Sequence, residues 1–132
     1  MTAFRLKIVT PDGIQYDGNA EELVVRTTTG DVGILAGHIN FVAPLGMGEA
    51  MILMDGKKRR AACIGGMVSV VNETVTLLPT TFEWADEIDV ARAERALERA
   101  KAKKESKTEA KDIALAELKF KRALNRINVG KK

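Results

Sequence analysis

The sequence predicts an α+β fold, in which an antiparallel β-sandwich of residues 1–85 is followed by an antiparallel two-helix hairpin of residues 86–132. The first observation is a change of hydrophobic period, which is two before Trp84 and three to four after it. The second is that nearly all glycines lie in the first part, and none lies between Gly66 and Gly130. The third is charge, because residues 1–85 hold 7 Lys+Arg and 9 Asp+Glu, whereas residues 86–132 hold 14 and 9.

In the first part, short apolar or alternating runs are separated by turn residues. Phe4, Leu6 and Ile8 alternate with Arg5 and Lys7, which predicts a strand with one buried face. The runs that follow are ELVVRT, VGIL, NFVAPL, EAMILM, AACIGG, MVSVV and TVTLLP. TPDG, TTGD, MDGKK and VNET stand between runs and supply the Gly, Asn and Asp of tight turns. Strands this short and evenly spaced predict two packed antiparallel sheets.

After Trp84, two segments have helical spacing, and Asp86 is expected to cap the first helix. The polar stretch KKESKTE predicts a loop centred near Lys107, although it could also stay helical in an extended form. The apolar stripes are narrow and rich in alanine, so the two helices bury little area against each other. At roughly 25 cal/mol per Å² the hairpin is only weakly stabilised, and a ligand or partner could open it. The alternative is a static hairpin. The apolar positions are Val90, Ala93, Leu97 and Ala100, then Ile113, Ala116, Phe120, Ala123 and Ile127.

Positive charge is expected to gather near the open end of the hairpin. With a loop at Lys107, facing residues have numbers that sum to about 214. Arg92 then lies across from Arg122, and Asp89 lies across from Asn125 and Arg126. Guanidinium groups in excess would suit a phosphate, which arginine binds through two hydrogen bonds. The alternative is that Asp89 caps the helix and pairs with Arg92 while the remaining charges are solvated, and spacing alone does not decide between the two.

Groups suited to catalysis are few, so we predict no catalytic residue and no metal site. The single histidine, His38, is far in sequence from the single cysteine, Cys63, and MDGKKRR is better interpreted as a hairpin turn before a basic strand than as a phosphate loop. No apolar run approaches the roughly 18 residues that span a bilayer, so work at a membrane would go through partners. A nucleic-acid-binding module is an alternative for the basic tail, but aromatic residues make up only 5% and none clusters among the basic ones.

Four motifs in a fixed order relate the chain to a known family. They are VTPDGIQYDG, TTTGDVGILAGHINFVAPL, CIGGMVSVVNETVTLLP and EIDVARAERALERA. In this order and spacing the chain resembles, over essentially its whole length, the epsilon subunit family of the F-type ATP synthase. It departs from the family pattern at Ala36, Asn40 and Met67, where the family usually has a proline, a proline or small residue, and an aromatic residue.

The resemblance implies a sandwich of about ten strands that joins the gamma subunit and rests on the polar loops of the membrane c-ring. The implied contact residues are Arg26, Asp31 and His38. It also implies a non-catalytic, regulatory subunit, peripheral on the cytoplasmic face of the bacterial plasma membrane. In this family the helices inhibit ATP hydrolysis when extended into the alpha/beta hexamer and permit it when folded down. A purely structural stalk subunit without a ligand is the alternative.

Some bacterial members of the family bind ATP through the motif I/L-D-x-x-R-A, which is intact here as Ile88, Asp89, Arg92 and Ala93. We expect ATP to bridge the two helices, with arginines holding the phosphates and Ile88 and Ala93 bordering the base. No cofactor is required on this view, ATP is a regulatory ligand, and a role for Mg²⁺ stays open. The matching positions outside the motif are Glu83, Arg99, Arg122 and Arg126.

Overall fold

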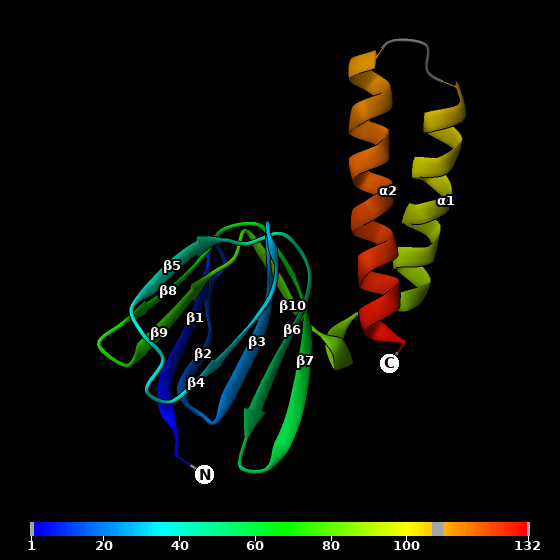
Figure 1. Ribbon diagram of the computed structural model, residues 1–132. Helices are drawn as coiled ribbons and strands as arrows, with labels where there is room; N and C mark the ends of the chain where they lie inside the picture. Colours follow the sequence, from blue (N-terminus) through cyan, green and yellow to red (C-terminus); the bar gives the residue numbers. More distant parts are fainter. Residues whose placement is uncertain (1, 107–109, 132) are drawn as a thin grey trace. The chain divides into compact units, whose positions relative to one another are not determined.

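The computed structural model describes residues 2–106 and 110–131. The chain divides into two compact units, Met1–Trp84 and Ala85–Lys132. Figure 1 shows the first as a set of strands and the second as a pair of helices. The predicted fold class, a β-sandwich followed by a helical hairpin, is confirmed.

Ten strands in the described part of the first unit form two five-stranded sheets. The first sheet has the order β2-β1-β9-β8-β5 and the second the order β10-β7-β6-β3-β4. The strands are β1 Phe4–Thr10, β2 Gly13–Ala20, β3 Glu22–Thr27, β4 Gly30–Leu35, β5 Phe41–Pro44, β6 Met47–Met54, β7 Lys57–Ile64, β8 Met67–Val71, β9 Thr74–Leu78 and β10 Thr81–Trp84.

The core lies between the two sheets because alternate residues of each strand point inward. Leu6, Ile8 and Leu77 of the first sheet and Leu23 and Ile52 of the second are fully buried in one hydrophobic cluster. Cys63 belongs to the same cluster, and burial raises the pKa of its thiol to about 12. This cysteine therefore packs as a small apolar residue.

One strand pairing departs from the antiparallel prediction. β1 pairs with β9 in parallel, with Leu6 beside Val75, while its other neighbour β2 is antiparallel to it. The pairing joins strands that are about 70 residues apart in sequence. Periodicity reports which face of a strand is buried but not which distant strand lies beside it, so this pairing could not be derived from the pattern.

The predicted turns form where the turn residues stand, and several adopt the left-handed backbone. Asp55 and Gly56 join β6 to β7 with φ of 51° and 73°, as a tight hairpin requires. Between β7 and β8, Gly66 has a φ of 88°. A Cβ added to Gly66 would lie 1.9 Å from the carbonyl oxygen of Leu78, so the backbones of two segments approach each other there without room for a side chain.

The second unit begins with a short 3-10 helix, Ala85–Glu87, followed by α1, Val90–Ser106, and α2, Ala110–Gly130. Asp86 lies in the 3-10 turn, so the prediction that it caps the first helix is wrong. The predicted loop centre, Lys107, lies outside the described residues. Within the described residues, neither helix is long and apolar enough to cross a membrane. The buried positions of the two helices include Ala93, Ala100, Ala116, Ala123 and Ile127, as the helical spacing predicted.

Candidate functional site

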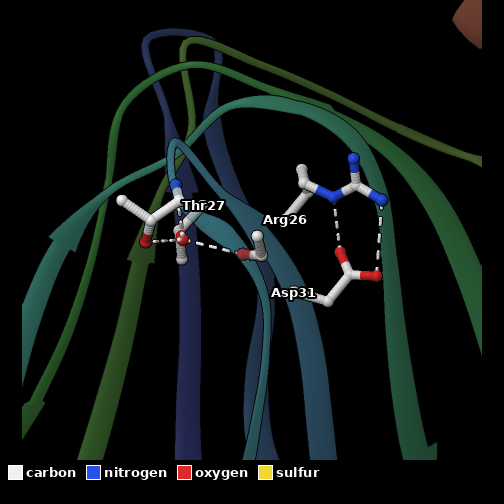
Figure 2. A network of polar contacts seen from close by, with 5 residues as sticks. Arg26, Thr27 and Asp31 are labelled. Atoms are coloured by element: carbon white, nitrogen blue, oxygen red, sulfur yellow. Dashed lines mark hydrogen bonds and ion pairs between the residues drawn. The ribbon is translucent and has the colours of Figure 1, made fainter.

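The end of the β3–β4 hairpin holds an ion pair between two residues predicted as contact residues. Arg26 and Asp31 are paired across the hairpin. Arg26 Nε donates a 2.6 Å hydrogen bond to Asp31 Oδ1, and Arg26 Nη2 donates one of 3.4 Å to Oδ2. Figure 2 shows the guanidinium and the carboxylate lying edge to edge, which is the two-bond geometry in which arginine binds a carboxylate best.

The ion pair shifts the pKa of both side chains. The hydrogen bond from Arg26, together with its charge, lowers the pKa of Asp31, and the reciprocal bond raises the pKa of Arg26. A carboxyl whose pKa is lowered on folding contributes stability above its unfolded pKa and loses it as the pH falls through the folded value. Both side chains are exposed, so this contribution is screened by solvent and salt.

Threonines order the turn beside the ion pair. Thr27 is buried, and its Oγ1 donates a 2.7 Å hydrogen bond to the Gly30 carbonyl while accepting one of 3.2 Å from the Thr29 amide. Thr10 makes the equivalent bonds to Gly13 and Asp12 at the β1–β2 hairpin. The side chain thus replaces missing backbone partners and fixes the turn.

His38 is separated from the Arg26–Asp31 pair. It follows β4, at the end of that strand opposite to Asp31. Its Nδ1 lies 2.8 Å from the Ile39 carbonyl oxygen, and its ring meets Phe41 edge to face with centroids 5.8 Å apart. The structure therefore joins two of the three predicted contact residues and places the third elsewhere on the sandwich.

An apolar patch covers part of the outer face of the first sheet, and we call it the outer patch. It consists of Val42, Pro44, Met67, Val71 and Leu78, whose side chains alternate with core residues on β5, β8 and β9. Met67 stands opposite both Pro44 and Leu78 in the strand register. Four of these side chains are 45–58% exposed, which is typical of a surface that binds another protein.

The register of the helical hairpin differs from the predicted one by four to six residues, which is more than one turn. A Cβ added to Gly130 would lie 2.8 Å from Val90 Cγ2 and 3.1 Å from Ile88 Cγ2, so the end of α2 packs beside the start of α1. Facing residues therefore sum to about 218–220 instead of 214. Arg126, rather than Arg122, lies level with Arg92. The reason is that α1 continues to Ser106 through residues that the prediction gave to the loop.

The four predicted arginines lie along one side of the hairpin. Each of Arg92, Arg99, Arg122 and Arg126 directly precedes a buried residue, namely Ala93, Ala100, Ala123 and Ile127. A residue one position before a contact residue lies about 100° to one side of it. Because the two helices are antiparallel, that rotation leads to the same side of the pair from either helix.

Two levels of positive charge follow on this side, which we call the basic flank. Arg92 and Arg126 form one level, and Arg99 lies about 10 Å further along α1, with Arg122 between the levels. Glu94 and Glu117 lie on the opposite side, where they pair with Lys131 at 2.9 Å and Lys121 at 3.9 Å. These two carboxylates thus lie away from the basic flank and pair with lysines of their own side.

The remaining predicted ligand residues lie at the start of α1 or before it. Asp89 Oδ1 accepts a 3.0 Å hydrogen bond from the Arg92 amide, and the Asp89 carbonyl accepts one of 3.0 Å from the Ala93 amide. Asp89 is therefore the N-cap of α1, as one of the two alternatives for this residue anticipated. Ile88 and Ala93 are buried, and Glu83 lies on β10 opposite Ala62 in the first unit.

The capping role gives a prediction for α1. Asp89→Ala is expected to lower the free energy of unfolding of the helical unit by about 1 kcal/mol, because the Arg92 amide loses its acceptor. Asp89→Asn keeps a capping oxygen and should change it by only a few tenths. Helical circular dichroism during thermal unfolding checks the difference, and equal losses in the two variants would contradict the cap.

Two features were missed in the sequence. Lys119 directly precedes Phe120, a half-buried residue of the α2 stripe, so the same rotation places it on the basic flank near the level of Arg99. The sequence contained a signal for Lys119, because it is one of several basic residues that directly precede a residue of an apolar helix stripe. The outer patch could have been found from Val42, Met67, Val71 and Leu78, which are apolar at positions that alternate with core residues.

Comparisons with known proteins agree along the whole chain. A family model described as the ATP synthase Delta/Epsilon chain beta-sandwich domain matches residues 3–85, and one described as the long alpha-helix domain matches residues 86–131. The ATP synthase epsilon chain of Ruminococcus albus is 45% identical over 100% of this chain and 99% of its own length. That of Bacillus pumilus is 42% identical over 100% of both chains.

Solved structures show the same likeness. A chain of the Euglena gracilis mitochondrial ATP synthase, in a structure of OSCP, F1 and the c-ring, has a TM-score of 0.83 and 26% identity, and covers 95% of this chain and 79% of that chain. A chain of the Tetrahymena thermophila mitochondrial ATP synthase central stalk and c-ring has a TM-score of 0.69 at 12% identity over 96% and 95% of the two chains. The second likeness is one of fold alone.

Proposed function

Because the chain belongs to the epsilon subunits of the F-type ATP synthase, we propose that it is a non-catalytic subunit of the central stalk that couples the gamma subunit to the c-ring during proton-driven ATP synthesis and regulates ATP hydrolysis. It works at the cytoplasmic face of a bacterial plasma membrane and is held there through the complex. Its regulatory ligand is ATP, bound on the basic flank of the helical hairpin.

Two surfaces of the sandwich support the contacts that we propose for a stalk subunit. The outer patch is apolar and exposed, which supports docking of the gamma subunit there, with His38 at the adjoining end of β5. The end of the β3–β4 hairpin is polar and is ordered by the Arg26–Asp31 pair and Thr27, which suits contact with the polar loops of the c-ring.

The observation that supports ATP binding is the alignment of arginines on the basic flank. Arg92, Arg99, Arg122 and Arg126 lie on one side of a narrow two-helix unit, where like charges repel at close spacing. A triphosphate would replace this repulsion by charge-assisted hydrogen bonds, and Arg92, Arg122 and Arg126 would hold it between the helices. Lys119 extends the same surface toward the level of Arg99. Glu83, in the first unit, remains a proposed ligand residue by its match to the family position.

ATP binding would regulate the hairpin through its effect on the compact form. A ligand that binds only that form stabilises it by RT ln(1 + [L]/Kd), which is about 2.7 kcal/mol at a hundredfold excess over Kd. The stripe between α1 and α2 is rich in alanine, so the two helices bury little apolar area against each other. A ligand contribution of this size is therefore large enough to decide whether the hairpin stays folded. High ATP would favour the folded hairpin and relieve inhibition, whereas low ATP would free the helices to extend into the alpha/beta hexamer.

Calorimetric titration of the full chain tests this proposal. ATP is expected to bind saturably, and Arg122→Ala should weaken binding by about 10- to 100-fold, because hydrogen bonds to charged groups contribute about 1.5–3 kcal/mol. Lys121→Ala is the matched control, since Lys121 adjoins Arg122 but is rotated about 100° from it around α2, toward its ion-pair partner Glu117.

Two results would contradict ligand binding on the basic flank. The first is the absence of heat at millimolar ATP. The second is equal weakening by Arg122→Ala and Lys121→Ala, which would indicate a general response to net charge. Either result would leave the chain as a stalk subunit whose arginines serve folding or subunit contacts.

A further inference from the structure

Two glycines of β6 and the turn before it lie against the residues of the β3–β4 hairpin end. A Cβ added to Gly48 would lie 2.6 Å from Arg26 Cβ and 3.0 Å from Arg26 Cγ. A Cβ added to Gly46 would lie 3.1 Å from the Thr27 carbonyl oxygen and 3.5 Å from Arg26 Cγ. Gly46 also donates its amide to the Arg26 carbonyl oxygen over 3.0 Å.

The contact at Gly48 cannot be relieved by turning a flexible side chain. Arg26 Cβ is fixed to the β3 backbone, so a side chain at position 48 would force the two strands apart at this point. The stem of Arg26 therefore lies across β6 only because position 48 has no side chain. From there its guanidinium reaches Asp31 with Nε at 2.6 Å from Oδ1.

Other charges near this part of β6 have partners of their own. Glu49, next to Gly48, has Oε1 at 3.9 Å from Arg60 Nε on β7. At the hairpin end, Arg26 and Asp31 pair with each other through the two hydrogen bonds drawn in Figure 2.

From this geometry we infer that Gly48 is a positioning residue, which lays Arg26 across β6 so that Asp31 is presented as half of a neutral ion pair. The end of the hairpin then displays paired charges beside threonine hydroxyls. Such a surface fits a neutral, hydrogen-bonding partner loop better than a cationic one, which would have to displace Arg26 first. The statement about the partner rests on the proposed contact with the c-ring, whereas the role of Gly48 within the chain does not.

A carboxyl titration of the full chain by nuclear magnetic resonance tests the positioning role. In the unchanged chain Asp31 should titrate below an ordinary aspartate. Gly48→Ala should move its pKa toward the ordinary value, and Arg26→Gln should do the same. Gly33→Ala is the matched control, because no described heavy atom lies within 4 Å of a Cβ built on that β4 glycine, and it should leave Asp31 unchanged. An unchanged Asp31 pKa in Gly48→Ala would overturn the inference.

A rescue experiment covers the case in which Gly48→Ala folds poorly. If the alanine acts by colliding with Arg26, then Arg26→Gly should remove the collision, and Gly48→Ala should shift the urea midpoint far less in the Arg26→Gly background than in the native one. Equal shifts in both backgrounds would mean that Gly48 serves the backbone alone, which refutes a positioning role.

The assembled synthase separates this inference from the proposed function. With Gly48→Ala in the reconstituted complex, proton-driven ATP synthesis should fall, while Gly33→Ala should leave it unchanged. If Asp31 shifts its pKa in the isolated chain but synthesis is unaffected, the positioning role holds and the proposed c-ring contact at this hairpin is wrong.

Discussion

Gly66→Ala is expected to lower the free energy of unfolding of the sandwich by about 3 kcal/mol or more, or to prevent folding. The added Cβ would lie 1.9 Å from the Leu78 carbonyl oxygen and 2.8 Å from Pro79 Cα, both of them backbone atoms. The φ of 88° at Gly66 adds strain for any residue with a Cβ. Urea unfolding followed by the fluorescence of Trp84, the single tryptophan, measures the loss.

Gly33→Ala is the control for this substitution as well. Gly33 has open space around its Cβ position among the described residues and does not adopt a positive φ. Its replacement should change the free energy of unfolding by less than about 1 kcal/mol. A Gly66→Ala chain as stable as the Gly33→Ala chain would mean that the β7–β8 connection is less tightly packed than described.

Removing residues 87–132 from the subunit is expected to raise ATP hydrolysis by the assembled synthase. The helical unit is compact by itself, so its loss leaves the core of the sandwich intact. Each 1.4 kcal/mol by which the tail favours the inhibited enzyme corresponds to about a tenfold change in the populations. The rise should be greatest at low ATP, where the folded hairpin has least ligand to stabilise it.

Unchanged hydrolysis after this removal would favour the purely structural stalk subunit. Arg92→Ala together with Arg126→Ala in the full-length chain provides the matched comparison. This double substitution removes two of the arginines proposed to bind ATP while keeping both helices. Because ATP could then no longer stabilise the folded hairpin, hydrolysis should stay inhibited even at high ATP. A loss of inhibition in the double variant would show that these arginines act in inhibition itself.

The spacing of apolar residues predicted the strands and helices of this fold well, because burying one face of a strand or helix requires that spacing. Phe4, Leu6 and Ile8 alternate on β1 and are all buried, and Ala93 and Ala100 are buried on α1. Turn residues marked the hairpins, as at Asp55 and Gly56. Each of these features depends on neighbours in sequence, and so a single chain displays it.

Features that depend on distant residues were less predictable. The cap moved from Asp86 to Asp89 because a 3-10 turn intervenes, and the hairpin register shifted because α1 continues to Ser106. The approach of Gly48 to Arg26 joins two strands and has no local signature. Arg92, Arg122 and Arg126 were expected near the open end of the hairpin, but which of them stand level required the packing of Gly130 against Val90, and their role as ligand residues stays a prediction.

The buried thiol of Cys63 can serve as an intrinsic probe of opening of the sandwich. Only a thiolate reacts rapidly with alkylating reagents, and burial raises the pKa of this thiol to about 12. Modification therefore has to wait for the two sheets to part, and its rate at a fixed pH measures how often they do so. Since the chain has a single cysteine, located in the first unit, the same reagent would follow the opening of the sandwich inside a working rotor.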